Sequence, residues 1–380
     1  MGKIAPVALC LAVLALVGLG VVILASTSVW DEGPAMEYFH LKRQILWLVA
    51  GLVLAGFLMV TDYRLLKDIW LPLALVSTVL LLLCYVPGIR VESNGEARWI
   101  KAPLIGRFQP SELAKLTSMI SLAAWYAKYQ AEKRTFWKGF VLPGALIGVP
   151  IVLVLFETDM GTAAAMSGAG FLLLFVAGAR LRYLFPTILA GALALVVVVQ
   201  SNDNRRKRIE AFQNLEEHRL GVGLQQYRSI MAFANGGVAG VGLGNGLEKH
   251  GYLPEAHTDF IFPMVGEELG LRVTLGVVFC FVMISVFGIQ ISLAAPDLFG
   301  RLLGVGLTAV IIVPAVMNMG VTTVLLPNTG LPLPFVSYGG SSLVFTLAMV
   351  GLLLSIHRRV VLVERAELPV IKEKKLEIRI

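Results

Sequence analysis

The chain carries little charge for its length. Charged residues make up 15% of its 380 residues, hydrophobic residues make up 57%, and the mean hydropathy is +0.79. A soluble globular domain has roughly 25% charged residues. Apolar stretches of about 20 residues, long enough to cross a bilayer core, recur along the whole chain. The composition therefore excludes a soluble protein and predicts an integral membrane protein.

Cysteine is scarce as well. The chain has three, Cys10, Cys84 and Cys280, and each lies inside an apolar run. Cysteines in such runs are usually buried as small hydrophobic residues, and these three have no metal-ligand spacing. The sequence therefore predicts neither a disulfide nor a metal site among them.

Several ligand-binding motifs are absent. The sequence has no Walker A motif, which argues against an internal ATPase site, and the glycines of segment 240–246 fit no register of G-x-G-x-x-G. A net charge of +7 can indicate nucleic-acid binding. In a membrane protein, basic loops that face anionic lipid are the commoner cause. We therefore expect no nucleic-acid partner.

What the sequence does have is a series of apolar segments, which we interpret as ten membrane-spanning helices. The fold class expected is an all-α integral membrane protein. Residues 1–363 form one membrane domain, and residues 364–380 form a charged cytoplasmic tail. The predicted spans are residues 5–25, 44–61, 70–88, 111–127, 139–156, 161–179, 183–200, 261–290, 302–326 and 339–357.

Basic residues indicate the orientation, because Lys and Arg in short loops favour the cytoplasmic side. With both termini cytoplasmic, the short inner loops hold nine Lys and Arg residues against six in the short outer loops. This orientation makes segment 201–260 a large extracytoplasmic loop between the seventh and eighth spans. Loops of that length are usually functional or disordered. Hydrophobic residues throughout this one favour an ordered, partly membrane-embedded loop.

Asp259 is the first of several ionisable residues close to the membrane. It ends the string EAHTD, where the outer loop re-enters an apolar run. A partly desolvated carboxylate at that place is suited to general-base chemistry. The alternative is structural, because Thr258 or Asp259 can cap the helix that follows. Spacing alone leaves both interpretations open.

Two adjacent glutamates, Glu267 and Glu268, lie inside the next predicted span, with Arg272 one turn further on. Charges at that depth need partners or a water-filled cavity. The sequence allows either an internal ion-pair network that holds helices together or a functional polar cavity.

The string RFQPSELAK, residues 107–115, begins the fourth predicted span. Pro110 suits the first helical position, and Glu112 and Lys115 lie three residues apart on one helix face. An intrahelical ion pair is one interpretation. In the other, Arg107 and Lys115 lie at the outer mouth of a polar cavity and are available to a phosphate.

Asp159 and the run Arg205–Arg208 complete the set. Asp159 precedes the sixth predicted span and can cap it, or pair with Lys115 or with a substrate-binding arginine. The basic run starts the long outer loop. It is either a solvated patch or an anion site in which guanidinium groups such as those of Arg205 and Arg208 bind a diphosphate.

At these motifs the sequence resembles the SEDS family (shape, elongation, division and sporulation) of peptidoglycan polymerases, and within it the division-type members. The matching strings run in family order over nearly the whole chain. They are NGEARWI (94–100), RFQPSELAK (107–115), Asp159–Thr162, LPEAHTDFIF (253–262), Glu267–Gly270 and LPLPFVSYGGSS (331–342).

The resemblance implies a ten-helix glycosyltransferase of the bacterial cytoplasmic membrane whose active site is extracytoplasmic. The glycan on its undecaprenyl diphosphate is the donor, and the 4-hydroxyl of an incoming lipid II is the acceptor. Asp259 matches the family's essential outer-loop aspartate. Matches to the family's polar cavity are Arg98, Glu112, Lys115 and Asp159; Arg107, Arg205, Arg208, His257, Ser337 and Ser341 complete the expected substrate-binding set.

The same resemblance implies a class B penicillin-binding protein, a transpeptidase, as partner, together with other divisome or elongasome proteins. No cofactor is required by the sequence, although a divalent cation (Mg or Mn) can share the diphosphate charge. A lipid II flippase is the main alternative function, and an inactive scaffold is a third. A transporter places its decisive groups near the midplane, often in paired repeats, and no repeat is visible here.

The chain departs from the usual family pattern at a few positions. Thr158 and Met160 flank the cavity aspartate, and Asn328-Thr329 replaces a frequent Thr-Lys pair. Arg228 and Arg272 stand where the family usually has uncharged residues. None of these removes an expected catalytic residue, but the two arginines can alter the charge of the cavity.

Overall fold

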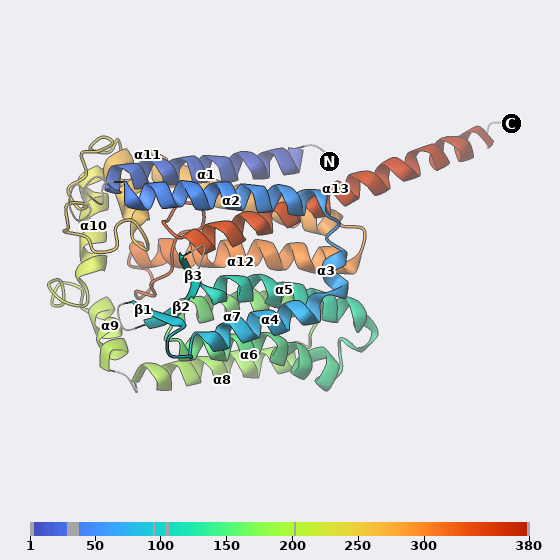
Figure 1. Cartoon of the computed structure of the whole chain (residues 1–380), viewed down its shortest axis with the longest axis horizontal. Coiled ribbons are helices and arrows are strands. Elements are labelled where there is room, and N and C mark those ends of the chain that lie inside the picture. Colours follow the sequence, from blue (N-terminus) through green and yellow to red (C-terminus); the bar gives the residue numbers. More distant parts are fainter. Residues whose placement is uncertain (1–3, 29–37, 94–95, 103–105, 201–202, 378–380) are drawn as a thin grey trace.

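Long helices account for most of the chain in the computed structural model, which describes residues 4–28, 38–93, 96–102, 106–200 and 203–377. Figure 1 shows the helices packed side by side along one direction. The long helices are α1 (Ile4–Ser28), α2 (Phe39–Val60), α4 (Trp70–Leu83), α5 (Pro110–Lys128), α6 (Leu142–Phe156), α7 (Met160–Ala177), α8 (Leu181–Gln200), α11 (Ile261–Ala294), α12 (Leu298–Thr322) and α13 (Gly340–Glu377). The shorter elements are α3 (Leu65–Asp68), η1 (Gln130–Glu132), η2 (Trp137–Val141), α9 (Asp203–Gln213) and α10 (Leu224–Gly236).

The all-α membrane class predicted from the sequence is confirmed. Seven helices in the described part of the chain are long and apolar enough to cross a membrane by length and composition. The other three predicted spans coincide with α4, α5 and α8. Helix α4 and the apolar part of α8 are shorter than the rest, and α5 is polar, so the count of ten stays a prediction.

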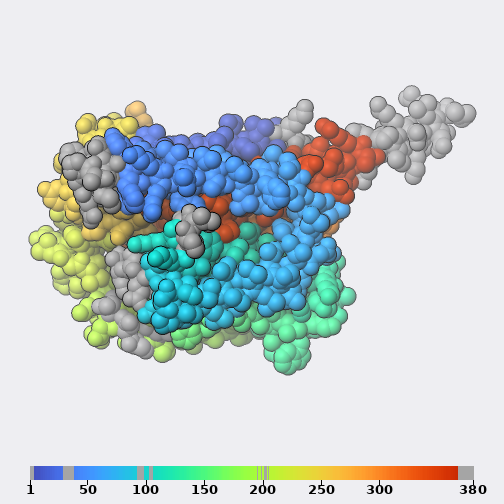
Figure 2. Space-filling model, viewed as in Figure 1, coloured from blue at the N-terminus to red at the C-terminus, as the bar shows by residue number. Residues whose placement is uncertain are grey.

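The polarity of α5 follows from its central position. Fifteen of its 19 residues are buried, and it packs against α4, α6, α7 and α12. A helix surrounded by protein can hold serine, threonine and paired charges without exposing them to lipid. Helices α2 and α4 show the opposite pattern, because each has only two buried residues and many of their apolar side chains are exposed. They cover the face seen in Figure 2, where we expect lipid contact.

The two ends of the bundle differ. Both termini lie at one end, and α9, α10 and a small sheet lie at the other (Figure 1). The sheet connects α4 to α5 and consists of β1 (Arg90–Ser93), β2 (Glu96–Ala102) and β3 (Gly106–Phe108) in antiparallel order β1-β2-β3. The hydropathy analysis did not predict these strands, and it carried the third span to residue 88, whereas α4 ends at Leu83.

The long loop of residues 201–260 is held against the bundle by α10. At its end, Gly236 packs so closely on α11 that a methyl group added there would overlap the Gly266 carbonyl. Backbone bonds continue the contact: the Val241 and Gly242 amides donate to the Glu267 and Glu268 carbonyl oxygens at 2.9 and 3.0 Å. The loop therefore adds hydrogen bonds to the amino-terminal part of α11.

We predict that Gly236→Ala destabilises the protein by about 1–3 kcal/mol, because the added methyl group must push α10 away from α11. Gly191→Ala is the matched control, since nothing lies within 4 Å of the new carbon on α8. The measurement is the thermal unfolding midpoint of each purified variant in detergent. Equal midpoints for the two variants would contradict the close contact.

Candidate functional site

Asp259 is half-buried immediately before α11. The N-cap position of that helix belongs to Phe260, and no side-chain cap bond is formed there. The Thr258 hydroxyl instead donates to Glu255 Oε2 at 2.8 Å. Phe260, and neither Thr258 nor Asp259, therefore occupies the N-cap position of this helix.

The backbone of Asp259 is held by an amide from α12. Asn318 Nδ2 donates to the Asp259 carbonyl oxygen at 2.7 Å and to the Leu331 carbonyl oxygen at 2.6 Å. This bridge brings the α12–α13 loop, residues 323–339, against the start of α11. Gly330 in that loop has a φ of +69°, and a Cβ added there would lie 3.3 Å from Asp259 Oδ2. The carboxylate therefore lies beside a glycine that leaves it room.

His257 and Ser337 reinforce the same junction. Ser337 Oγ donates to the Thr258 carbonyl oxygen at 2.6 Å and accepts from the Leu333 amide at 2.8 Å. The Tyr338 amide donates to the His257 carbonyl oxygen at 2.9 Å. The His257 ring stacks on His40 with 4.5 Å between the ring centroids. Both predicted substrate-binding residues thus lie next to the chain that carries Asp259.

Two further contacts tie the α12–α13 loop to other helices. Gln44 of α2 donates to the Ser337 carbonyl oxygen at 3.1 Å and accepts from the Gly339 amide at 3.2 Å. Ser341, in the first turn of α13, accepts from the Gln109 amide at 3.2 Å, directly before α5. The loop is therefore fixed from α2 and, through α13, from the start of α5.

Asp159 has both of the roles that the sequence left open. Its Oδ1 accepts from the Thr162 amide at 2.9 Å, which caps α7. Its Oδ2 lies 3.7 Å from Arg98 Nη1, so the partner is an arginine. Gly161, two residues on, packs against the α12–α13 loop, where an added Cβ would lie 2.6 Å from the Thr329 carbonyl oxygen. The Arg98–Asp159 pair is thus linked through the loop to Asp259.

Glu112 and Lys115 form the intrahelical pair that their spacing predicts. Lys115 Nζ lies 2.8 Å from Glu112 Oε2, and both side chains are buried in α5. Arg107 lies elsewhere, exposed on β3 opposite Lys101. In this structure the Lys115 ammonium is therefore neutralised by Glu112, and Arg107 is solvated.

Arg205 and Arg208 belong to α9, which packs on α8 at the end of the bundle opposite the termini. Arg205 is half-buried and Arg208 is exposed. Between them, Arg206 forms an ion pair with Glu210 at 3.0 Å. Their proposed role in binding a diphosphate stays a prediction.

The glutamate pair of α11 forms an internal network. Glu268 Oε1 lies 2.7 Å from Lys249 Nζ and accepts from Ser26 Oγ at 2.7 Å. Glu267 accepts from the Leu247 and Glu248 amides at 3.0 and 3.2 Å. Of the two interpretations, the structure shows the ion-pair network, and this network links α1 and the long loop before α11 to α11.

Neither unusual arginine contacts the Asp259 region. Arg228 lies 3.5 Å from Glu248 and its guanidinium lies over the Tyr252 ring at 5.1 Å. Arg272 is exposed on α11. Burial raises the pKa of Glu248, and the positive charge of Arg228 opposes that shift. Arg228 is therefore paired within the long loop, and Arg272 lies on the exposed face of α11.

Glu157 is a site residue that the sequence analysis did not single out. It is buried between α6 and α7, close to the Cys84 thiol, and it forms no ion pair at 4 Å or less within the described residues. Burial raises the pKa of Glu157 to about 8, and the negative charge of Asp159 acts in the same direction, while Cys84 and Arg98 oppose it. Its proximity in sequence to Asp159 was the signal that it belongs to the same polar group.

The raised pKa of Glu157 gives a pH prediction. The folded protein keeps this proton up to a pH of about 8, whereas the unfolded chain loses it near 4.5. Because the folded state binds more protons in that window, stability falls as pH rises from 4.5 to 8. We expect Glu157→Gln to remove this pH dependence. The thermal midpoint of wild type, measured relative to that of the variant, should therefore fall as pH rises.

The measurement is thermal unfolding in detergent at a series of pH values across that window. Glu217→Gln, an exposed glutamate in the outer loop, is the control and should follow wild type. Parallel curves for Glu157→Gln and wild type would show that Glu157 is ionised in the folded protein.

Comparison with known proteins supports one assignment. A family model described as cell cycle protein, covering FtsW, RodA and SpoVE, matches residues 7–361. A protein of Geobacter metallireducens named probable peptidoglycan glycosyltransferase FtsW is 40% identical over 85% of this chain and 86% of its own length. Stage V sporulation protein E of Bacillus subtilis is 36% identical over 89% and 92%.

Solved structures agree. A chain from a structure titled "Structural coordination of polymerization and crosslinking by a peptidoglycan synthase complex" superposes with a TM-score of 0.76 and 31% identity, over 93% of this chain and 97% of that one. RodA of Thermus thermophilus gives a TM-score of 0.67 and 31% identity, over 92% and 95%. From the extent of these matches, the chain belongs to the SEDS family of FtsW, RodA and SpoVE proteins, and it is closer to FtsW.

Proposed function

We infer that this protein is a peptidoglycan glycosyltransferase that polymerises lipid II into glycan strands at the outer face of the cytoplasmic membrane. The observation that carries this inference is the placement of Asp259, half-buried and held through its backbone by Asn318. Two ion pairs, Arg98–Asp159 and Glu112–Lys115, lie on elements joined to the same loop. The relatives named above as peptidoglycan glycosyltransferases support it.

The proposed chemistry uses Asp259 as the general base. Its carboxylate takes the proton from the 4-hydroxyl of the acceptor, and that oxygen attacks the anomeric carbon of the donor sugar. The bond from this carbon to the diphosphate oxygen breaks, and the diphosphate leaves with the electron pair. A single displacement of this kind inverts the anomeric centre. Because Asn318 and Ser337 hold the backbone on either side, the carboxylate is positioned by contacts to main-chain atoms.

The leaving diphosphate develops negative charge, and cations near it stabilise the transition state. Arg98 and Lys115 are our candidates, with Asp159 and Glu112 holding each cation in place when no substrate is bound. Guanidinium groups bind phosphate oxygens in bidentate fashion. We further propose that Arg107, Arg205 and Arg208 attract the diphosphate from the surface, and that His257, Ser337 and Ser341 shape the acceptor side.

A divalent cation that shares the diphosphate charge remains a proposal. Among the described residues, no three His, Cys, Asp or Glu side chains are grouped so that they could hold a metal ion. Such an ion would take most of its ligands from phosphate oxygens and water. No step proposed above passes through it.

We propose that the end of the bundle with the termini is cytoplasmic and that the end with the sheet, α9 and α10 is extracytoplasmic (Figure 1). The excess of basic residues in the inner loops supports this orientation. A class B penicillin-binding protein is the proposed partner, in agreement with the synthase complex whose polymerase-like chain superposes on this one. The similarity to FtsW favours a role in division.

The first test is polymerisation of purified lipid II by the detergent-solubilised protein, with and without a cognate transpeptidase. We expect long glycan products from wild type and from Asp68→Asn, which changes an exposed aspartate of α3, and none from Asp259→Asn. Products from Asp259→Asn would remove this residue from the chemistry. Failure of wild type with its partner present would favour lipid transport instead.

A second prediction concerns the space beside the carboxylate. We expect Gly330→Ala to lower the polymerisation rate by about ten- to a hundredfold, because its Cβ would press on Asp259 and its positive φ is strained for alanine. The control is Gly148→Ala on α6, where nothing lies within 4 Å of the added carbon. A Gly330→Ala enzyme with unchanged rate would place the reacting groups away from Gly330.

A further inference from the structure

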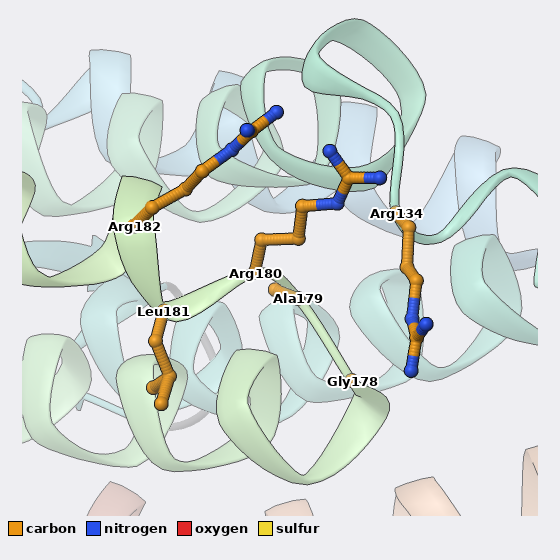
Figure 3. A pocket seen from close by; sticks show the side chains of 6 residues that line it. All are labelled: Arg134, Gly178, Ala179, Arg180, Leu181 and Arg182. Atoms are coloured by element: carbon orange, nitrogen blue, oxygen red, sulfur yellow. The ribbon is translucent and has the colours of Figure 1, made fainter.

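A basic pocket lies at the end of the bundle that carries the termini, away from Asp259 (Figures 1 and 3). It has a volume of about 400 Å³ and is formed where α7 ends and α8 begins, with the loop after α5 as its other wall. Its lining residues are Arg134, Gly178, Ala179, Arg180, Leu181 and Arg182. Figure 3 shows Arg180 extending towards the loop that carries Arg134.

The cations of this pocket have few protein partners in the described part of the chain: the Arg182 guanidinium lies over the Tyr183 ring, 4.6 Å from its centroid. Glu132, the acid nearest in sequence on the α5 side, is paired with Lys138 at 2.6 Å. Within the described residues, Arg134, Arg180 and Arg182 form no ion pair with a carboxylate. A fourth cation stands close by, because a Cβ added at Gly178 would lie 3.5 Å from Lys133 Nζ. Four cations around one cavity indicate an anionic ligand.

The backbone brings opposite ends of two helices to the pocket. Helix α7 ends at Ala177, its C-cap Gly178 has a φ of +93°, and α8 begins at Leu181. The carboxyl end of α7 carries the negative end of its dipole and itself attracts the neighbouring cations. The first amides of a helix lack intrahelical acceptors and carry the positive end of its dipole. The pocket therefore combines side-chain cations with the amino-terminal end of a 20-residue helix.

The rim of the pocket distinguishes a lipid from a soluble anion. Leu181 and Phe185 lie four residues apart on α8, hence on one face of that helix, and are 62% and 71% exposed. Across the pocket, the exposed Phe136 packs against Tyr183 with 5.1 Å between the ring centroids, and the neighbouring Trp137 is exposed too. Exposed apolar and aromatic side chains beside cations are typical of a membrane–water interface.

We propose that this pocket binds the phosphate headgroup of an anionic phospholipid from the leaflet at this end of the bundle. The guanidinium groups of Arg134, Arg180 and Arg182 contact the phosphate oxygens, and the acyl chains lie over Leu181 and Phe185. This site is separate from the glycosyl-transfer site, and it holds the α5–α6 and α7–α8 connections together through a shared ligand.

The test is native mass spectrometry of the full-length protein titrated with phosphatidylglycerol or phosphatidylcholine, which gives the dissociation constant of the first lipid bound. The site variant is Arg134→Gln/Arg180→Gln/Arg182→Gln. Its control, Lys67→Gln/Lys128→Gln/Arg365→Gln, removes the same charge from exposed residues outside the pocket. We expect the site variant to bind phosphatidylglycerol on the order of a hundredfold more weakly than wild type, and the control to lose much less.

Equal losses in the two variants would overturn the proposal, because general attraction to the basic end would then explain the binding. Tight binding of inorganic phosphate to the pocket without a preference for phosphatidylglycerol would also overturn it, in favour of a soluble anion. Arg180→Gln alone is the second variant and should show an intermediate loss. Lipid binding is read without enzymatic turnover, so this result is independent of whether the proposed polymerase activity holds.

Discussion

The arrangement of the site depends on one constraint: a non-helical stretch of backbone between α12 and α13 has to satisfy its hydrogen bonds inside a membrane protein, away from bulk water. Side chains from distant elements do this. Gln44 donates to the Ser337 carbonyl oxygen and accepts from the Gly339 amide, and Asn318 donates to the Leu331 carbonyl oxygen. The side-chain amide of Gln226 donates to the Val321 carbonyl oxygen near the end of α12. Because Asn318 also donates to the Asp259 carbonyl oxygen, the same side chain fixes the backbone from which the carboxylate projects.

Four buried glutamates differ in the partners that surround their carboxylates. Glu268 forms an ion pair with Lys249 and accepts a hydrogen bond from Ser26, and Glu267 accepts hydrogen bonds from backbone amides. Glu112 has a lysine one turn away. Glu157 has no cation at ion-pair distance among the described residues, and burial raises its pKa. A buried charge is costly without a partner. The partners of Glu112, Glu267 and Glu268 suit structural or positioning roles. Glu157 instead lies in the polar interior near Asp159.

Hydropathy predicted the helices well because lipid-facing segments such as α1 and α11 must be apolar along their length. It missed the sheet, whose strands are short and polar, although Asn94-Gly95 is a known hairpin signal. The Glu112–Lys115 pair followed from local spacing. The Ser26–Glu268 contact joins residues 242 positions apart and could not follow from spacing. Neutral amides such as Asn318 give no comparable signal, because an uncharged side chain in an apolar segment does not stand out in the sequence.

The break in helix α11 at Gly270 determines how much of this helix can cross a membrane. Its 34 residues would measure about 50 Å as one straight helix, far longer than a bilayer core of about 30 Å. The backbone leaves helical geometry at Gly270, and the Leu271 amide bonds to the Gly237 carbonyl oxygen of the outer loop. The part before Gly270 is thus a piece of the extracytoplasmic cap in the proposed orientation. The remaining segment, residues 271–294, would measure about 36 Å as a helix, which is close to the thickness of a bilayer core.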